Sequence, residues 1–235
     1  TIGGMMATNA GGTRVLRYGA MRAQVVGVEA VLGTGDVVSH LGGLLKDNTG
    51  YDLASLLCGS EGTLGIVTAV RLRLVASAAA RATVLVAVRG VADAMACFAA
   101  ARRGAATTLE GAELFFADGL ALVCTRLDVP PPFADDVVRA AGAYLLLEAA
   151  GPSDPTEPLV DALSTVADAV LDTAVATTSA RREELWRYRE AHPEAINAVG
   201  VPHKLDVTLP HDQLATFCDD VPVVVASVAP SARVY

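Results

Sequence analysis

The sequence predicts an α+β protein made of two parts that meet near residue 75. Three observations lead to this prediction. Residues 1–75 combine β-branched runs with two glycine-rich stretches. Residues 76–235 alternate short apolar runs with segments whose apolar residues recur at helical spacing. Finally, 52% of the 235 residues are hydrophobic and 19% are charged, so the chain carries enough apolar material for a buried core.

The regular structure of the first part begins with a predicted hairpin. Residues 25–32 are rich in β-branched side chains, and Thr34-Gly35-Asp36 is a turn signal that leads into Val37-Val38. Residues 51–57 are predicted to form a short helix, with Asp52 near its N-terminus, where helix starts favour an acidic side chain.

A glycine-rich loop and a strand complete the first part. Residues 59–65 contain too many glycines for regular structure. From Ile66 onward, apolar residues alternate with Arg71 and Arg73, which predicts a half-exposed strand. Positions 66, 68, 70, 72 and 74 are expected to share its apolar face.

The second part alternates predicted strands and helices. The residues Val91, Met95, Phe98 and Ala99 show the helical spacing most clearly, and Ser179 is expected to cap a long helix. The predicted elements are strand 82–88, helix 91–102, strands 113–116 and 144–147, helix 157–171, strand 174–178, helix 180–199, strand 205–209 and a helix from His211. This β-α-β-β-α-β order predicts a ferredoxin-like layer.

Composition excludes several classes of protein. The net charge of -8 argues against a nucleic-acid-binding protein, which needs a basic face. The longest apolar run, residues 221–230, contains two prolines and is far shorter than the ~20 residues of a membrane span. The four cysteines form no C-x-x-C motif, and no signal peptide is visible in the sequence, so we expect free thiols and a cytoplasmic location. The four histidines show no metal-binding spacing, and we expect a surface or capping position for each.

The two glycine-rich stretches are the first candidate site. Thr8-Asn9-Ala10-Gly11-Gly12 and Gly59-Ser60-Glu61-Gly62 could bring backbone N–H groups close to phosphate oxygens or to a flat ring, because glycine has no Cβ in the way. Neither stretch has the spacing of the dinucleotide fingerprint or of a phosphate-binding loop. For any single glycine, a turn or a bulge is the simpler explanation.

In combination and in this order, the stretches resemble a known family. Thr1-Ile2-Gly3-Gly4, residues 8–12, Lys46-Asp47-Asn48-Thr49-Gly50-Tyr51-Asp52-Leu53 and residues 59–66 resemble the second half of the FAD-binding domain of FAD-linked 2-hydroxy-acid dehydrogenases. These are vanillyl-alcohol-oxidase-type flavoproteins of the D-2-hydroxyglutarate, D-lactate and glycolate oxidase branch. The resemblance implies that residues 1–75 are part of a FAD-binding domain and that residues 76–235 are the substrate domain, truncated at its end. It implies FAD as cofactor, with contacts from Gly3, Gly4, Asn9, Gly11, Gly12, Gly59, Ser60, Glu61, Gly62, Gly65 and Ile66.

A second pair of motifs extends the resemblance. Trp186-Arg187-Tyr188-Arg189-Glu190 and Lys204-Leu205-Asp206-Val207-Thr208-Leu209-Pro210 are similar to the family's W-x-x-R-E helix and its K-x-D strand. The resemblance implies that Arg189 and Lys204 bind the substrate carboxylate. Pro193 stands where the family has a substrate-contacting Thr, and it should kink the helix. A solvated helix face with ion pairs one turn apart is the alternative reading of these charges.

Parts of the family's machinery are expected outside this sequence. Its first flavin loop should precede Thr1, and its motif for a zinc-like divalent metal and a catalytic histidine should follow Tyr235, so no catalytic residue is assigned here. We expect a fragment that binds FAD weakly by itself. The alternatives are an inactive binding module completed by a partner chain, or an enzyme of the ether-lipid synthase branch, which Lys204 and residues 46–53 disfavour. The choice between D-2-hydroxyglutarate and D-lactate, the electron acceptor and a homodimeric state are left open.

Overall fold

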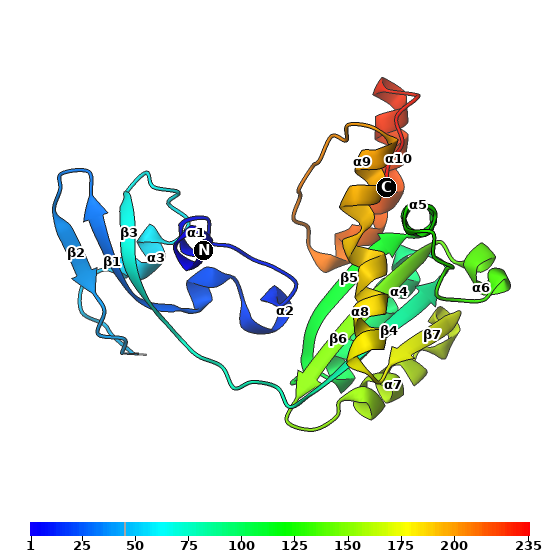
Figure 1. The fold of residues 1–235 in the computed structure, drawn as a ribbon, viewed down its shortest axis with the longest axis horizontal. Helices are drawn as coiled ribbons and strands as arrows, with labels where there is room; N and C mark the ends of the chain where they lie inside the picture. The colour runs from blue at the N-terminus through cyan, green and yellow to red at the C-terminus, as the bar shows by residue number, and fades with distance from the viewer. Residues whose placement is uncertain (45) are drawn as a thin grey trace. The chain divides into compact units, whose positions relative to one another are not determined.

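A computed structural model describes residues 1–44 and 46–235, which form two compact units, Thr1–Ser77 and Ala78–Tyr235 (Figure 1). The first unit contains a three-stranded antiparallel sheet with strand order β2-β1-β3. Its elements are α1 Ile2–Ala7, α2 Val15–Tyr18, a 3-10 turn Met21–Ala23, β1 Val25–Leu32, β2 Val37–His40, α3 Leu53–Leu57 and β3 Gly65–Leu72.

The predicted hairpin is confirmed as β1 and β2. Its turn is closed by the Leu32 amide, which donates to the Asp36 carbonyl at 2.9 Å. Gly35 takes a positive φ of 88° there, a conformation that glycine adopts without steric cost. The short helix is also confirmed, because Asp52 caps α3 by accepting from the Ser55 amide at 2.9 Å.

The predicted face of β3 is wrong over its first half. The pairing of β3 with β1 is irregular between Glu29 and Ala30, so Thr68 is an extra residue opposite them. Such a bulge reverses which side chains point to a given face. Val67 therefore packs in the core of this unit together with Val70, while Ile66 is 65% exposed.

The second unit is built on a four-stranded antiparallel sheet with order β5-β6-β4-β7. Its strands are β4 Ala80–Val88, β5 Leu109–Phe116, β6 Ala143–Gly151 and β7 Asp172–Ala176. Its helices are α4 Val91–Gly104, α5 Ala117–Leu127, α6 Asp135–Ala140, α7 Thr156–Ser164, α8 Ser179–Glu190, α9 His192–Val199 and α10 Leu214–Val228. The chain passes β4-α4-β5-β6-α7-β7, with α5 and α6 inserted before β6, which confirms the ferredoxin-like prediction.

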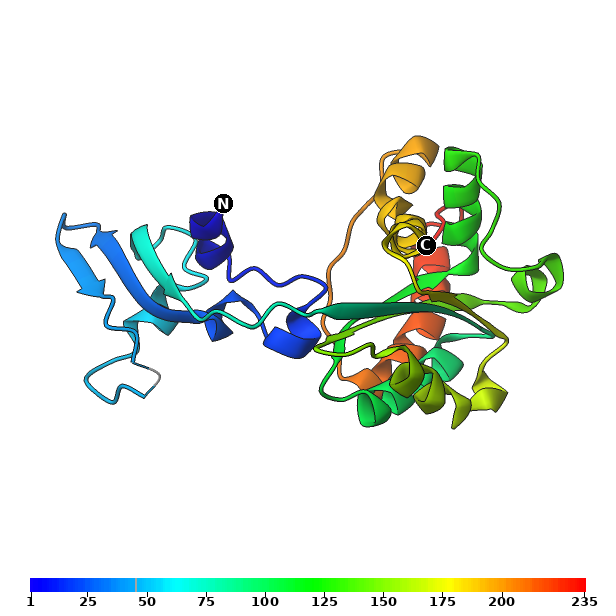
Figure 2. The ribbon, with the colours of Figure 1, turned by 60° about the horizontal axis from the view of Figure 1, so that its bottom comes forward.

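Helices cover both faces of this sheet (Figure 2). Val84, Val86 and Val88 of β4 point to one face and pack with side chains of α4 and α7. Leu85 and Ala87 point to the other face and pack with side chains of α5, α8 and α9. Because the second part of β4 is buried on both faces, residues 84–88 are a continuous apolar run and not an alternating one.

Three predicted elements of the second unit need correction. The helix expected over 157–171 ends at Ser164, because the Ser164 and Thr165 hydroxyls donate to nearby carbonyls at 2.7 Å and compete with the helical pattern. The helix expected over 180–199 is interrupted at Ala191, and Pro193 lies in the first turn of α9, where its missing N–H costs nothing. The N-cap of α8 is Thr178, whose hydroxyl accepts from the Arg181 amide, and not Ser179 as expected.

The strand expected over residues 205–209 is not formed. Residues 200–210 have neither helix nor strand, although Leu205, Val207 and Leu209 alternate as a half-buried strand would. Alternation alone does not make a strand, because the backbone also needs a neighbouring strand to pair with. Within the described parts of the chain, no helix has both the length and the apolar character that a membrane crossing requires.

Candidate functional site

The two glycine-rich stretches of the first unit lie side by side. The Gly59 amide donates to the Met6 carbonyl at 2.9 Å, and the Glu61 amide donates to the Ala7 carbonyl at 3.0 Å. These bonds join the end of α1 to the loop after α3, although more than fifty positions separate them in the sequence. The backbone thus brings together the stretches that the sequence marks as one candidate site.

Asn9 holds this arrangement together. Its side-chain Oδ1 accepts from the Arg22 amide at 2.9 Å and lies 3.7 Å from Cys58 Sγ. The Arg22 guanidinium in turn donates to the Cys58 carbonyl at 2.7 Å. Asn9 also takes a positive φ of 48°, which Asn tolerates better than most residues. Its side-chain oxygen is therefore used by the protein, and the role that the structure gives Asn9 is to shape the loop.

Some glycines of this site are required by the backbone conformation, and others are not. Gly59 and Gly62 have φ values of 85° and 80°, so the backbone itself requires glycine there. In contrast, Gly3 and Gly12 have ordinary φ values, and a Cβ added to either would meet no protein atom within 4 Å. The protein has no internal reason for glycine at these two positions, which fits a surface against which a ligand lies closely.

Two sequence-based expectations at this site change with the structure. Gly3 and Gly4 are not in a loop, because Thr1 caps the short helix α1 through its hydroxyl, which accepts from the Gly4 amide at 3.1 Å. Gly65 is buried in β3, where a Cβ would come within 2.8 Å of the Val31 carbonyl oxygen, so strand packing explains it.

The remaining predicted contacts of the first unit lie at its surface. Gly11 is exposed, Ser60 is half-buried, and Glu61 is exposed with a positive φ of 49°. Ile66 is exposed as well, because the bulge in β3 turns it away from the core. The amides of Gly59, Ser60 and Glu61 already donate to backbone carbonyls. Among the described residues, the amides of Gly11, Gly12 and Gly62 have no such bond and could donate to the phosphates of a ligand.

In the second unit, Arg189 is held by a carboxylate that sequence reasoning missed. Arg189 lies near the end of α8, and its Nε donates to Oε2 of Glu113 on β5 at 2.8 Å. The two side chains are 35% and 22% exposed, so the pair is only half accessible to water. The signal that could have revealed it is an acidic residue among the apolar residues in the second half of the strand Leu109–Phe116.

Further polar contacts attach α8 to the sheet. The Trp186 Nε1 donates to Glu148 of β6 at 2.8 Å, and Glu148 also accepts from Thr83 and Arg81 at 3.2 Å. The Tyr188 hydroxyl donates to the Pro130 carbonyl at 2.8 Å. Because the carboxylate of Glu148 is buried, its three donors are what makes its charged form tolerable there.

Lys204, the other predicted substrate ligand, lies apart from regular structure. It belongs to the exposed segment 200–210, and among the described residues no hydrogen bond or ion pair involves it. The structure does not join its ammonium group to Arg189. Its proposed role therefore depends on the resemblance and not on a contact seen here.

Of the two expected positions, surface or capping, His192 has the capping one, and it is buried. Its ring packs against Phe115 with centroids 5.0 Å apart. Its Nδ1 contacts the Arg189 carbonyl at 3.1 Å and so caps the end of α8, while its Nε2 has no partner among the described residues. Burial lowers the pKa of His192, because the charged imidazolium is poorly solvated there.

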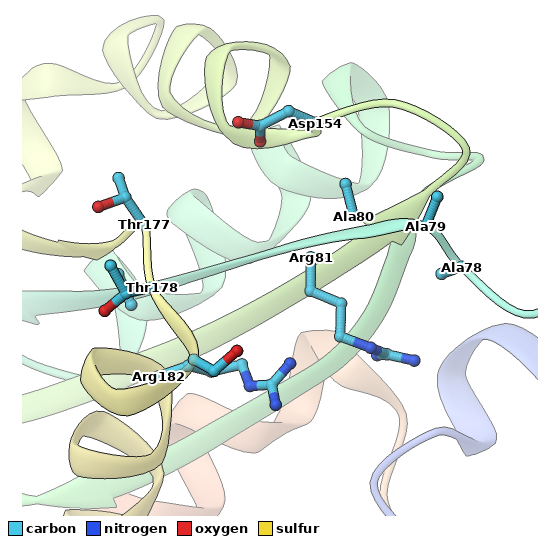
Figure 3. Close-up of a pocket in the computed structure, with 10 residues that line it drawn as sticks. Ala78, Ala79, Ala80, Arg81, Asp154, Thr177, Thr178 and Arg182 are labelled. Carbon is cyan, nitrogen blue, oxygen red and sulfur yellow. The ribbon is translucent and has the colours of Figure 1, made fainter.

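A cavity of about 330 Å³ lies where α8 begins, and it is lined by residues of the second unit (Figure 3). In this view the Arg81 and Arg182 side chains lie on one side of β4 and the Asp154 carboxylate lies on the other. Arg81 is paired with Glu110 at 2.5 Å and with Glu148 at 3.2 Å. Neither Arg189 nor Lys204 lines this cavity.

No metal site is formed by the described part of the chain. Among residues 1–44 and 46–235, no three His, Cys, Asp or Glu side chains cluster as metal ligands would. The cysteines Cys58, Cys97, Cys124 and Cys218 are free thiols. The implied divalent metal therefore finds no set of donors in the residues described.

The chain is similar to proteins of known name over nearly all of its length. It is 37% identical to bovine (Bos taurus) mitochondrial D-2-hydroxyglutarate dehydrogenase over 99% of the chain and 42% of that protein. It is 34% identical to the mitochondrial D-2-hydroxyglutarate dehydrogenase of Arabidopsis thaliana over 94% of the chain and 40% of that protein. It is 36% identical to D-2-hydroxyglutarate dehydrogenase of Xanthomonas citri over 89% of the chain and 43% of that protein. The chain thus spans about 40% of the length of these relatives. Two of them are named as mitochondrial, and the cytoplasmic location expected for this chain stays a prediction.

A solved structure and two family models agree with this similarity. An alkyldihydroxyacetonephosphate synthase structure matches with a TM-score of 0.62 and 17% identity, over 96% of this chain and 45% of that one, which supports the fold alone. Residues 1–40 match the model of the FAD binding domain. Residues 77–227 match the model of the C-terminal domain of FAD linked oxidases. Because this second match covers more than half of the chain, the chain belongs to the family of FAD-linked oxidases.

Proposed function

We propose that the protein containing this chain is a FAD-dependent D-2-hydroxy-acid dehydrogenase, which oxidises D-2-hydroxyglutarate or D-lactate to the 2-oxo acid. The observation that carries this proposal is the similarity to D-2-hydroxyglutarate dehydrogenases over 94–99% of the chain. We further propose that residues 1–75 belong to the FAD-binding domain and residues 76–235 to the substrate domain. The division into two units supports this assignment.

In this proposal the first unit forms part of the FAD site. FAD, when bound, accepts the hydride from the substrate carbon. The amides of Gly11, Gly12 and Gly62, which have no backbone partner among the described residues, would face its phosphates. The open positions Gly3 and Gly12 would let it approach the backbone. The proposed contacts are Gly3, Gly4, Asn9, Gly11, Gly12, Gly59, Ser60, Glu61, Gly62, Gly65 and Ile66.

Arg189 and Lys204 are proposed to bind the substrate carboxylate. A planar guanidinium can bind a carboxylate through two parallel hydrogen bonds, and a Lys ammonium adds a compact second charge. Pro193 has neither a hydroxyl nor an N–H to offer, so the third contact that the family makes there is not available in the same form. A divalent metal would need ligands beyond the described residues, and no step is derived through it.

The proposal is tested with the complete protein encoded around this sequence. The purified flavoprotein should reduce an artificial electron-accepting dye when D-2-hydroxyglutarate or D-lactate is added, and not with the L-enantiomers. Arg189→Ala should raise the KM for the substrate by about a hundredfold, because it removes a charge-assisted carboxylate contact. The matched control Arg187→Ala, on an exposed position of the same helix, should leave the KM unchanged. No dye reduction with any D-2-hydroxy acid would refute the proposal.

A further inference from the structure

The ion pair between Arg189 and Glu113 has a geometry that leaves one edge of the guanidinium open. Glu113 lies in the edge strand β5, opposite Leu146 of β6, on the face of the sheet covered by α8. Its carboxylate accepts from Nε of Arg189, the nitrogen nearest to the helix. Among the described residues, neither Nη1 nor Nη2 of Arg189 has a hydrogen-bond partner. The outer edge of the guanidinium therefore keeps two parallel N–H groups, the arrangement that a carboxylate can accept end-on.

Glu113 is not needed to place the helix that carries Arg189. Leu185 is fully buried and Tyr188 nearly so, and both pack in the core between α8 and the sheet. Trp186 and Tyr188 add hydrogen bonds of 2.8 Å to Glu148 and Pro130. With α8 attached by these contacts, the effect of Glu113 is local to the guanidinium group of Arg189.

A long arginine side chain has many rotamers, and a free guanidinium at this half-exposed position would sample several of them. A carboxylate fixed on a sheet strand restricts this motion and sets the plane of the group. The ion pair of Glu113 with Arg189 also differs from the ion pair of Arg181 with Glu184. The second pair lies on the exposed side of the same helix and joins two flexible side chains.

We propose that Glu113 is a positioning residue, which holds Arg189 by Nε so that the Nη1–Nη2 edge binds the carboxylate of the 2-hydroxy acid. This inference deepens the proposed function and rests on it. It predicts that the loss of Glu113 weakens substrate binding through Arg189 and not through the fold.

The test compares Glu113→Ala, Glu113→Gln, Arg189→Ala and Glu184→Ala in the complete flavoprotein. Three quantities are measured for each variant: the KM and kcat for D-2-hydroxyglutarate, and the dissociation constant of 2-oxoglutarate by calorimetry. Thermal melting of each variant reports on the fold. Glu113→Ala should raise KM and the dissociation constant by about tenfold, with a much smaller change in kcat, because the guanidinium loses its orientation.

The other variants separate the proposed positioning role of Glu113 from an effect of its charge and from an effect on the fold. Glu113→Gln should restore KM to within about threefold of the parent value, since an amide oxygen still accepts from Nε. Glu184→Ala, the matched control, should change neither constant. If Glu113→Ala does not fold, Glu113→Asp replaces it, and its shorter carboxylate should raise KM in the same way.

The outcomes distinguish this inference from the function on which it rests. If Arg189→Ala raises KM while Glu113→Ala binds both ligands as the parent does, the positioning role is wrong and the proposed function stands. If Glu113→Ala and Glu184→Ala lower stability and raise KM to a similar extent, the ion pair of Glu113 with Arg189 is structural only and the inference is overturned. If the parent protein oxidises and binds no D-2-hydroxy acid, the proposed function itself fails.

Discussion

The hydroxyl of Tyr144 allows a sharp test of the core of the second unit. Tyr144 is fully buried in β6, between the rings of Phe115 and Phe133, with ring centroids 5.6 and 5.8 Å away. Among the described residues its hydroxyl has no hydrogen-bond partner, and burial raises the pKa of Tyr144. A buried hydroxyl without a partner loses its hydration and gains nothing in return.

The substitution Tyr144→Phe should therefore stabilise the protein. An unsatisfied buried polar group costs about 1–3 kcal/mol, and the phenylalanine ring keeps both aromatic contacts. Removal of the oxygen leaves a void and forfeits some dispersion contacts, so we expect a net gain of about 1 kcal/mol. For a chain of this size, this corresponds to a rise in melting temperature of about 2–4 °C.

Tyr188→Phe is the matched control and should have the opposite sign. It removes the same oxygen from the same kind of ring, but this hydroxyl donates to the Pro130 carbonyl at 2.8 Å. Loss of that bond should destabilise by about 1 kcal/mol. Both variants are measured by urea unfolding followed by the fluorescence of Trp186, the single tryptophan of the sequence, which lies in the second unit. A Tyr144→Phe variant that is less stable than the parent would refute the reasoning, because it would mean that the hydroxyl has a partner.

Three further predictions follow from buried or open positions. Burial lowers the pKa of His192, so as the pH falls the unfolded chain takes up a proton near pH 6.5, before the folded chain does. The free energy of unfolding, measured in urea, should therefore decrease as the pH drops below 6.5. His192→Gln should remove this pH dependence. Gly119→Ala places a Cβ 2.8 Å from the His192 ring and should cost about 1–3 kcal/mol by the same assay, whereas Gly33→Ala, with no atom within 4 Å, should not. Gly12→Val should leave the unfolding curve unchanged and yet weaken FAD binding in a fluorescence titration of the complete protein; unchanged FAD affinity would contradict the proposed cofactor contact.

The parts of the fold that depend on local chemistry could be predicted from the sequence. The turn at Gly35, the cap at Asp52 and the break before Pro193 follow from which backbone angles and hydrogen bonds those residues allow. Likewise, the order of apolar runs and helical segments was sufficient to predict the ferredoxin-like sheet.

Errors arose where a distant partner decides the outcome. The bulge at Thr68 reverses the face of β3 only because β1 pairs with it out of register there. Residues 205–209 carry a strand pattern but find no strand to pair with in the structure. His192 was expected in a surface or capping position, and its burial was not predicted, because its own neighbours in sequence do not reveal that Phe115 and Gly119 cover it.

The sequence by itself determined the family, the order of elements and which residues are candidates for binding, since these depend on residue type and spacing along the chain. Only the tertiary structure decided which candidates meet and what each one contacts. It joined the two glycine-rich stretches through Gly59 and Glu61, and it paired Arg189 with Glu113, which lies 76 positions earlier. The physical reason is that hydrogen bonds and ion pairs depend on distance in space, which folding sets, and not on separation along the chain.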